Sequence, residues 1–109
     1  MAGNYNITIN QNADFIRSFQ VKKNTVILDI TGYTFSGRIK ESFHTPGHTS
    51  FTTSIVDAAA GTFTIALTPA QTAALIPGTS VYDVIMADTA GIVTRLLDGN
   101  AFIIQGVTP

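Results

Sequence analysis

The stretch TFTIAL at residues 62–67 alternates apolar with small or polar residues more regularly than any other part of this chain. Phe63, Ile65 and Leu67 fall on one side of the pattern, and threonine or alanine falls on the other. Because successive side chains of a strand point to opposite faces, this alternation predicts a β-strand with one buried face.

The residues that follow predict a short helix. The Thr68 hydroxyl can accept hydrogen bonds from free amides of the first turn, and Pro69 suits the first helical position, where its missing N–H costs nothing. Good helix formers continue to Ile76, and Pro77 with Gly78 ends them. We expect Leu75 to fold back onto the core.

Strand-like segments separated by turn residues flank this unit at intervals of about ten residues, which is typical of a β-sandwich or barrel. The predicted strands are residues 5–10, 15–21, 26–30, 33–40, 51–55, 79–87, 92–97 and 101–105. Residues 79–87 are apolar on both faces and predict a central strand buried on both sides. Asp88–Gly91 and Asp98–Gly99 predict tight hairpins, because both residue types tolerate positive φ. The 109 residues suit a single domain spanning 1–109.

Charged residues make up only 12% of the chain, against about 25% in a typical soluble domain. Interface centres are depleted of charge, so this composition favours a protein covered by neighbours in an assembly. The net charge is −1 and the six basic residues are scattered, which is unlike a nucleic-acid-binding surface. There is no cysteine, no visible secretory signal and no apolar run near the roughly 18 residues that span a membrane.

Few residues suggest chemistry. His44 and His48 flank Pro46–Gly47, which forbids a helix, so they predict a loop and leave a shared metal at a symmetry axis as the less favoured reading. Phe43 completes this candidate contact loop. Asp83 lies in an apolar strand and requires a partner, for which Arg95 across the Asp88–Gly91 turn is the obvious candidate, as a pair that fixes hairpin register. No phosphate-binding, calcium-binding or nucleophile-elbow motif occurs, so we expect no enzyme activity, cofactor or metal.

The order of several segments resembles the small virion structural proteins of tailed bacteriophages, and in particular the immunoglobulin-like β-sandwich domains of tails and baseplates. The resemblance covers nearly the whole chain and rests on Leu28–Tyr33 leading into Gly37–Ile39, Gly61–Ile65 followed by Thr68–Leu75, and Val81–Val84 followed by Gly91–Gly99 and Gly106–Thr108. It implies an immunoglobulin-like antiparallel sandwich of seven to nine strands with one short helix. It also implies fold-determining roles for Asp29, Gly32, Tyr82, Asp83, Arg95 and Gly99, and no catalytic residues.

The resemblance implies a structural component of a phage particle, assembled in the host bacterial cytoplasm and located in the virion, most simply in the tail or baseplate. The expected partners are other virion proteins and copies of the chain itself, without nucleic acid or membrane. Residues 1–6 and 106–109 are expected to be flexible arms that order on assembly. Two alternatives remain: a capsid decoration protein, and an adhesion module that binds host glycan, although the chain has no tryptophan to stack on sugars.

Overall fold

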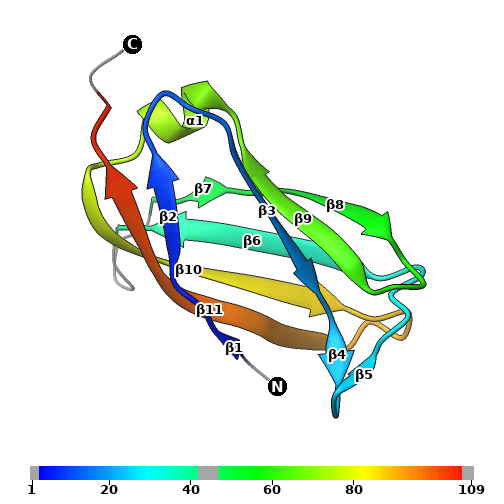
Figure 1. Cartoon of the computed structure of the whole chain (residues 1–109). Coiled ribbons are helices and arrows are strands. Elements are labelled where there is room, and N and C mark those ends of the chain that lie inside the picture. The colour runs from blue at the N-terminus through cyan, green and yellow to red at the C-terminus, as the bar shows by residue number, and fades with distance from the viewer. Residues whose placement is uncertain (1–2, 42–46, 107–109) are drawn as a thin grey trace.

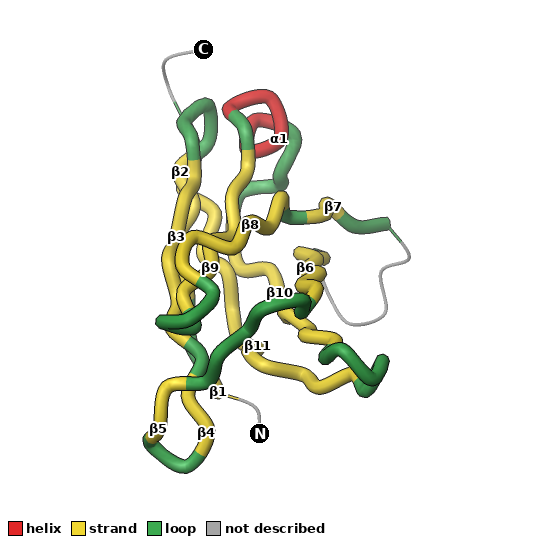
Figure 2. The backbone as a smooth tube through the Cα atoms, turned by 90° about the vertical axis from the view of Figure 1, so that its right-hand side faces the viewer, coloured by secondary structure: helices red, strands yellow, loops and turns green. Residues whose placement is uncertain are grey.

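The computed structural model describes residues 3–41 and 47–106, and it folds them into two β-sheets packed face to face (Figures 1 and 2). The larger sheet, sheet A, has the strand order β1-β11-β10-β6-β7, and β2 also pairs with β11. Its strands are β1 (Gly3–Asn4), β2 (Ile7–Asn10), β6 (Thr34–Lys40), β7 (Thr49–Ser50), β10 (Gly78–Ala87) and β11 (Val93–Ile104). The prediction of an all-β sandwich with one short helix is confirmed.

The smaller sheet, sheet B, has the order β3-β9-β8, and a separate two-stranded hairpin extends beyond it. These strands are β3 (Phe15–Gln20), β8 (Thr52–Asp57), β9 (Thr62–Leu67), β4 (Lys22–Lys23) and β5 (Val26–Ile27). The predicted segment 26–30 is therefore only partly a buried strand. Val26 and Ile27 are exposed at the tip of the projecting hairpin, while Ile30 is fully buried.

The core lies between the sheets and is built from the inward faces that alternation predicts. Phe63, Ile65 and Leu67 on β9 are buried, as are Ile7 and Ile9 on β2. The aromatic rings pack in sequence across the core: Phe63 stacks on Phe35 with ring centroids 4.3 Å apart. Tyr5, at the start of the predicted strand 5–10, is exposed, and its ring makes an edge contact with Phe19.

The single described helix, α1 (Pro69–Ala73), begins as the sequence predicts but is shorter. The Thr68 hydroxyl accepts from the Gln71 amide at 3.2 Å, and the Gln71 side chain accepts from the Thr68 amide at 2.9 Å. This reciprocal capping box satisfies two otherwise unpaired helical donors. Leu75, just beyond the helix, packs partly buried against the core as expected.

The sandwich is not wholly antiparallel, because the N-terminal segment joins sheet A in parallel. Both β1 and β2 run parallel to β11, while all other described pairings are antiparallel. Gly3 to Asn6, which belong to the expected N-terminal arm, lie against β11. Gly106 is also held, since its amide donates to Gln11 Oε1 at 3.0 Å. The remaining arm residues, 1–2 and 107–109, lie outside the described residues.

The predicted hairpin at Asp98–Gly99 is wrong. β11 runs without interruption from Val93 to Ile104, and Asp98 and Gly99 pair in register with Asp83 and Tyr82 of β10. The Asp88–Gly91 hairpin is present: the Asp88 carboxylate accepts from the Ala90 and Ile92 amides, each at 2.9 Å.

Candidate functional site

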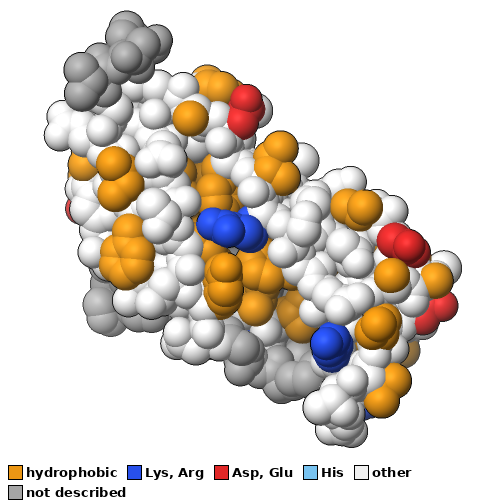
Figure 3. All heavy atoms as spheres, viewed as in Figure 1, with side chains coloured by type: hydrophobic (Ala, Val, Ile, Leu, Met, Phe, Trp, Pro, Cys, Tyr) orange, Lys and Arg blue, Asp and Glu red, His pale blue; other side chains and the backbone are white. Residues whose placement is uncertain are grey.

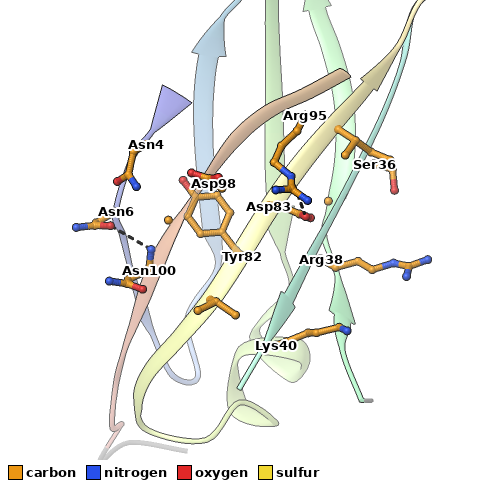
Figure 4. Close-up of a pocket in the computed structure, with 14 residues that line it drawn as sticks. Asn4, Asn6, Ser36, Arg38, Lys40, Tyr82, Asp83, Arg95, Asp98 and Asn100 are labelled. Carbon is orange, nitrogen blue, oxygen red and sulfur yellow. Dashed lines mark hydrogen bonds and ion pairs between the residues drawn. The ribbon is translucent and has the colours of Figure 1, made fainter. Parts of the chain in front are cut away.

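The outer face of sheet A is hollowed into a groove of about 670 Å³ (Figure 4). Its floor is formed by β6, β10 and β11, and one wall is formed by the N-terminal segment. The prediction that residues 79–87 are buried on both sides is therefore only half correct. β10 is central, and Tyr82, Val84 and Met86 are buried on its inner face, but Val81, Asp83 and Ile85 are only partly covered and line the groove.

Strand register places charged residues side by side across the groove. Asp83 on β10 is the register partner of Arg38 on β6 and of Asp98 on β11. Directly opposed like charges destabilise a sheet, so the Asp83–Asp98 pairing costs folding stability. A local irregularity between Val84 and Ile85 then brings Arg95 opposite Ile85.

The predicted ion pair between Asp83 and Arg95 is present, but in a different setting from the expected one. Arg95 Nε lies 3.7 Å from Asp83 Oδ2, and the side chains are 60% and 40% exposed, respectively. Exposed pairs contribute roughly 0–1 kcal/mol, so this contact adds little to the stability of the hairpin.

Two hydrogen bonds attach the N-terminal wall to β11, and a third attaches it to β10. The Tyr5 amide donates to the Asp98 carbonyl at 2.8 Å, and the Asn100 amide donates to Asn6 Oδ1 at 3.0 Å. The Tyr82 hydroxyl, reaching from β10, donates to the Tyr5 carbonyl. Gly99 permits this close approach, because a Cβ there would collide with the Tyr5 carbonyl oxygen. Tyr82 and Gly99 thus both contribute to holding the N-terminal segment against sheet A.

Burial raises the pKa of Tyr82 to about 12, with smaller contributions from nearby Tyr5 and Asp98. The ordinary pKa of tyrosine in an unfolded chain is about 10. Between pH 10 and 12 the unfolded chain therefore loses this proton before the folded protein does, so Tyr82 stabilises the fold fully below pH 10 and less as pH rises to 12.

We therefore expect Tyr82→Phe to lower the free energy of unfolding by about 1 kcal/mol at pH 7, because the hydrogen bond to the Tyr5 carbonyl is lost. We also expect its stability to fall less steeply than that of the unmodified protein between pH 10 and 12. Urea denaturation at a series of pH values measures both. Tyr33→Phe is the matched control, and an identical alkaline profile for Tyr82→Phe and the unmodified protein would contradict the assignment.

Asp29 and Gly32 lie in a turn away from the groove. Asp29 Oδ1 accepts from the Thr31 hydroxyl at 2.6 Å and from its amide at 2.9 Å, and these hydrogen bonds hold the pKa of Asp29 below its ordinary value. Gly32 adopts a φ of 79°, which favours glycine, and a Cβ there would come within 3.0 Å of the Thr89 methyl group. Of the six residues that the resemblance implies to be fold-determining, these two shape a turn and the other four line the groove.

The predicted contact loop falls mostly outside the described residues. Phe43 and His44 are among residues 42–46, whereas His48 is described and exposed. His48 borders a smaller hollow of about 200 Å³ together with Leu75 and Ser80. Within residues 3–41 and 47–106, no three His, Cys, Asp or Glu side chains gather closely enough to hold a metal ion.

Arg17 is a feature that the sequence analysis did not single out. It lies on β3, at the edge of sheet B, with its side chain on the inward side, and its Nε is buried with no hydrogen-bond partner in the described part of the chain. Inward-pointing charge on an edge strand is a known device against uncontrolled strand pairing. In the sequence, Arg17 is visible as a charged residue at an inward position between the apolar residues Phe15 and Phe19.

A scan against protein-family models finds no match, and a search of curated proteins finds no significant relative. Among the described residues, no helix has the length and apolar character needed to cross a membrane.

Proposed function

We propose that this chain is a non-enzymatic structural component of a tailed-bacteriophage particle, which packs against neighbouring subunits in the tail or baseplate. The segment order that resembles virion β-sandwich domains supports this proposal from the sequence. The surface of the folded chain supports it independently, because one face has the composition of a covered interface.

The supporting observation is the outer face of sheet B, which carries almost no charge. Its three strands align the residues in cross-strand rows, and only Asp57, at one end, is charged. The other residues on this outer face are Ile16, Ser18, Gln20, Thr52, Ser54, Thr62, Thr64 and Ala66. Figure 3 shows a face of the molecule on which charged side chains are sparse among uncharged ones. A solvated surface normally mixes charges of both signs, so a face of this kind suits burial against a neighbour.

Exposed aliphatic side chains near strand edges add to this argument. Ile16 on β3 and Val56 on β8 are 67% and 63% exposed, and β3 and β8 form the two edges of sheet B. Val26, on the projecting β4–β5 hairpin, is 67% exposed. Edge strands offer unpaired main-chain groups to another chain, and apolar side chains beside them would strengthen such a contact.

Quantitative mass spectrometry of purified virions tests the proposal. We expect a fixed, small copy number per particle, about three, six or twelve, because closed symmetry sets the stoichiometry of tail components. A ratio near that of the major capsid protein would instead identify a capsid decoration protein. Absence from purified particles would contradict a structural role altogether.

A further inference from the structure

We propose that the groove on the outer face of sheet A is a binding site for a neutral oligosaccharide. This inference concerns the folded chain alone and does not depend on its place in a virion. It rests on the shape of the groove, on the hydrogen-bonding groups that meet in it, and on the balance of its charges. The groove's volume of about 670 Å³ falls within the roughly 300–1,000 Å³ typical of ligand pockets.

Several polar side chains converge on the groove without being satisfied by one another. Asn4 and Asn100 lie with Asp98 at one side, as Figure 4 shows, and these three side chains make no hydrogen bond or ion pair within the described part of the chain. Asn6 uses one oxygen to accept from the Asn100 amide, and its side-chain NH₂ is left to donate. The groove therefore offers amide donors beside amide and carboxylate acceptors, the combination that adjacent sugar hydroxyls require.

The balance of charges disfavours a strongly charged ligand. Arg38 and Lys40 on β6 and Arg95 on β11 contribute three positive charges, and Asp83 and Asp98 contribute two negative ones. The signs are mixed within one cross-strand row, since Asp83 lies between Arg38 and Asp98. A polyanion would be repelled by the two carboxylates, and a polycation would be repelled by the three cations. Sugar hydroxyl groups, in contrast, can donate hydrogen bonds to the carboxylates and accept them from the cations.

The location of the groove on a sheet face, rather than at an edge, also favours a sugar over an extended peptide as the ligand. Peptide strands bind sheets mainly by adding main-chain hydrogen bonds along a free edge. β10 is paired on both sides, by β6 and β11, so the floor offers side chains and not an open main-chain ladder. Val81 and Ile85, partly exposed between the polar groups, give a small apolar floor against which the C–H face of a sugar ring can pack.

The opposed carboxylates of Asp83 and Asp98 fit a binding role better than a structural one. Their juxtaposition costs stability, and only Asp83 has an ion-pair partner among the described residues. Removing the Asp98 carboxylate should therefore leave the melting temperature unchanged or raise it. This property makes Asp98→Ala a clean test, because loss of binding could not be attributed to loss of folding.

The experiment is a titration of the isotopically labelled full-length chain, followed by NMR chemical shifts of its amides. The probes are maltohexaose, cellohexaose and chitohexaose as neutral oligosaccharides, with a sulfated heparin hexasaccharide as the charged comparison. We expect at least one neutral probe to give saturable shifts centred on Asn6, Asp83 and Asn100. Asp98→Ala should weaken that binding at least about tenfold, a loss of about 1.4 kcal/mol, and Thr64→Ala on the outer face of sheet B should not change it.

Four results would overturn the proposal. The first three are the absence of saturable shifts with every neutral probe, shifts that map outside the groove, and undiminished binding by Asp98→Ala. Tighter binding of the sulfated probe than of any neutral one would also overturn it, because Arg38 and Lys40 would then define an anion site. None of these outcomes bears on the copy number of the chain in virions.

Discussion

Replacing Phe63 with alanine is expected to destabilise the protein by about 3–5 kcal/mol, the range measured when buried aromatic residues are truncated. Phe63, near the start of β9, is fully buried, and its ring centroid lies 4.3 Å from that of Phe35, on which it stacks, and 5.8 Å from that of Phe19. The alanine would leave a cavity bordered by strands of both sheets, which cannot move together without breaking their ladders. Since small domains are stable by about 5–15 kcal/mol, this one change would remove a large part of the total.

Urea denaturation and thermal melting measure the effect, and the melting temperature should fall on the order of 20 °C. Ile16→Ala is the matched control, because Ile16 lies on neighbouring β3 but points outward and is 67% exposed. Its effect should stay within about 0.5 kcal/mol. A loss below about 1 kcal/mol for Phe63→Ala would mean that the two sheets do not pack through this side chain.

The strands around Phe63 could be predicted because their signal is local. Alternation along residues 62–67 determines which side chains face inward, and the Thr68 and Pro69 signals determine where the helix begins. The same reasoning fails at Asp98–Gly99, whose residue types favour a tight turn. Gly99 is there for another reason, namely the close approach of Tyr5, ninety-four residues earlier in the chain. A contact between residues so far apart in the sequence cannot be recognised from the residue types near Asp98 and Gly99.

The groove was predicted only in fragments. Asp83 and Arg95 were recognised as a pair, but an apolar neighbourhood in the sequence suggested burial, whereas β10 turns Val81, Asp83 and Ile85 toward the groove. Apolar residues on both faces of a strand do not show whether the second face is covered by another layer. The groove's lining also comes from the N-terminal segment, β6, β10 and β11, which only the sheet order brings together.

The second large effect is expected at Gly99, where alanine should destabilise the protein by about 2–3 kcal/mol, from two or three broken hydrogen bonds at roughly 1 kcal/mol each. The added Cβ would collide with the Tyr5 carbonyl oxygen and lie 3.1 Å from Asn6 Oδ1. Both oxygens are acceptors, from the Tyr82 hydroxyl and the Asn100 amide. The N-terminal segment must therefore move away from β11, and the groove loses one wall together with Asn4 and Asn6.

Gly91→Ala separates this collision from backbone strain. Gly91 has a φ of 87°, which alanine also adopts reluctantly, but nothing lies within 4 Å of the position of its Cβ. Gly91→Ala should therefore cost only about 1–2 kcal/mol of conformational strain. Hydrogen exchange gives the decisive comparison: the Tyr5 and Asn100 amides should lose protection in Gly99→Ala and keep it in Gly91→Ala. Those two amides donate the hydrogen bonds that join the N-terminal segment to β11. Equal protection in both variants would therefore mean that the N-terminal segment does not form part of the groove.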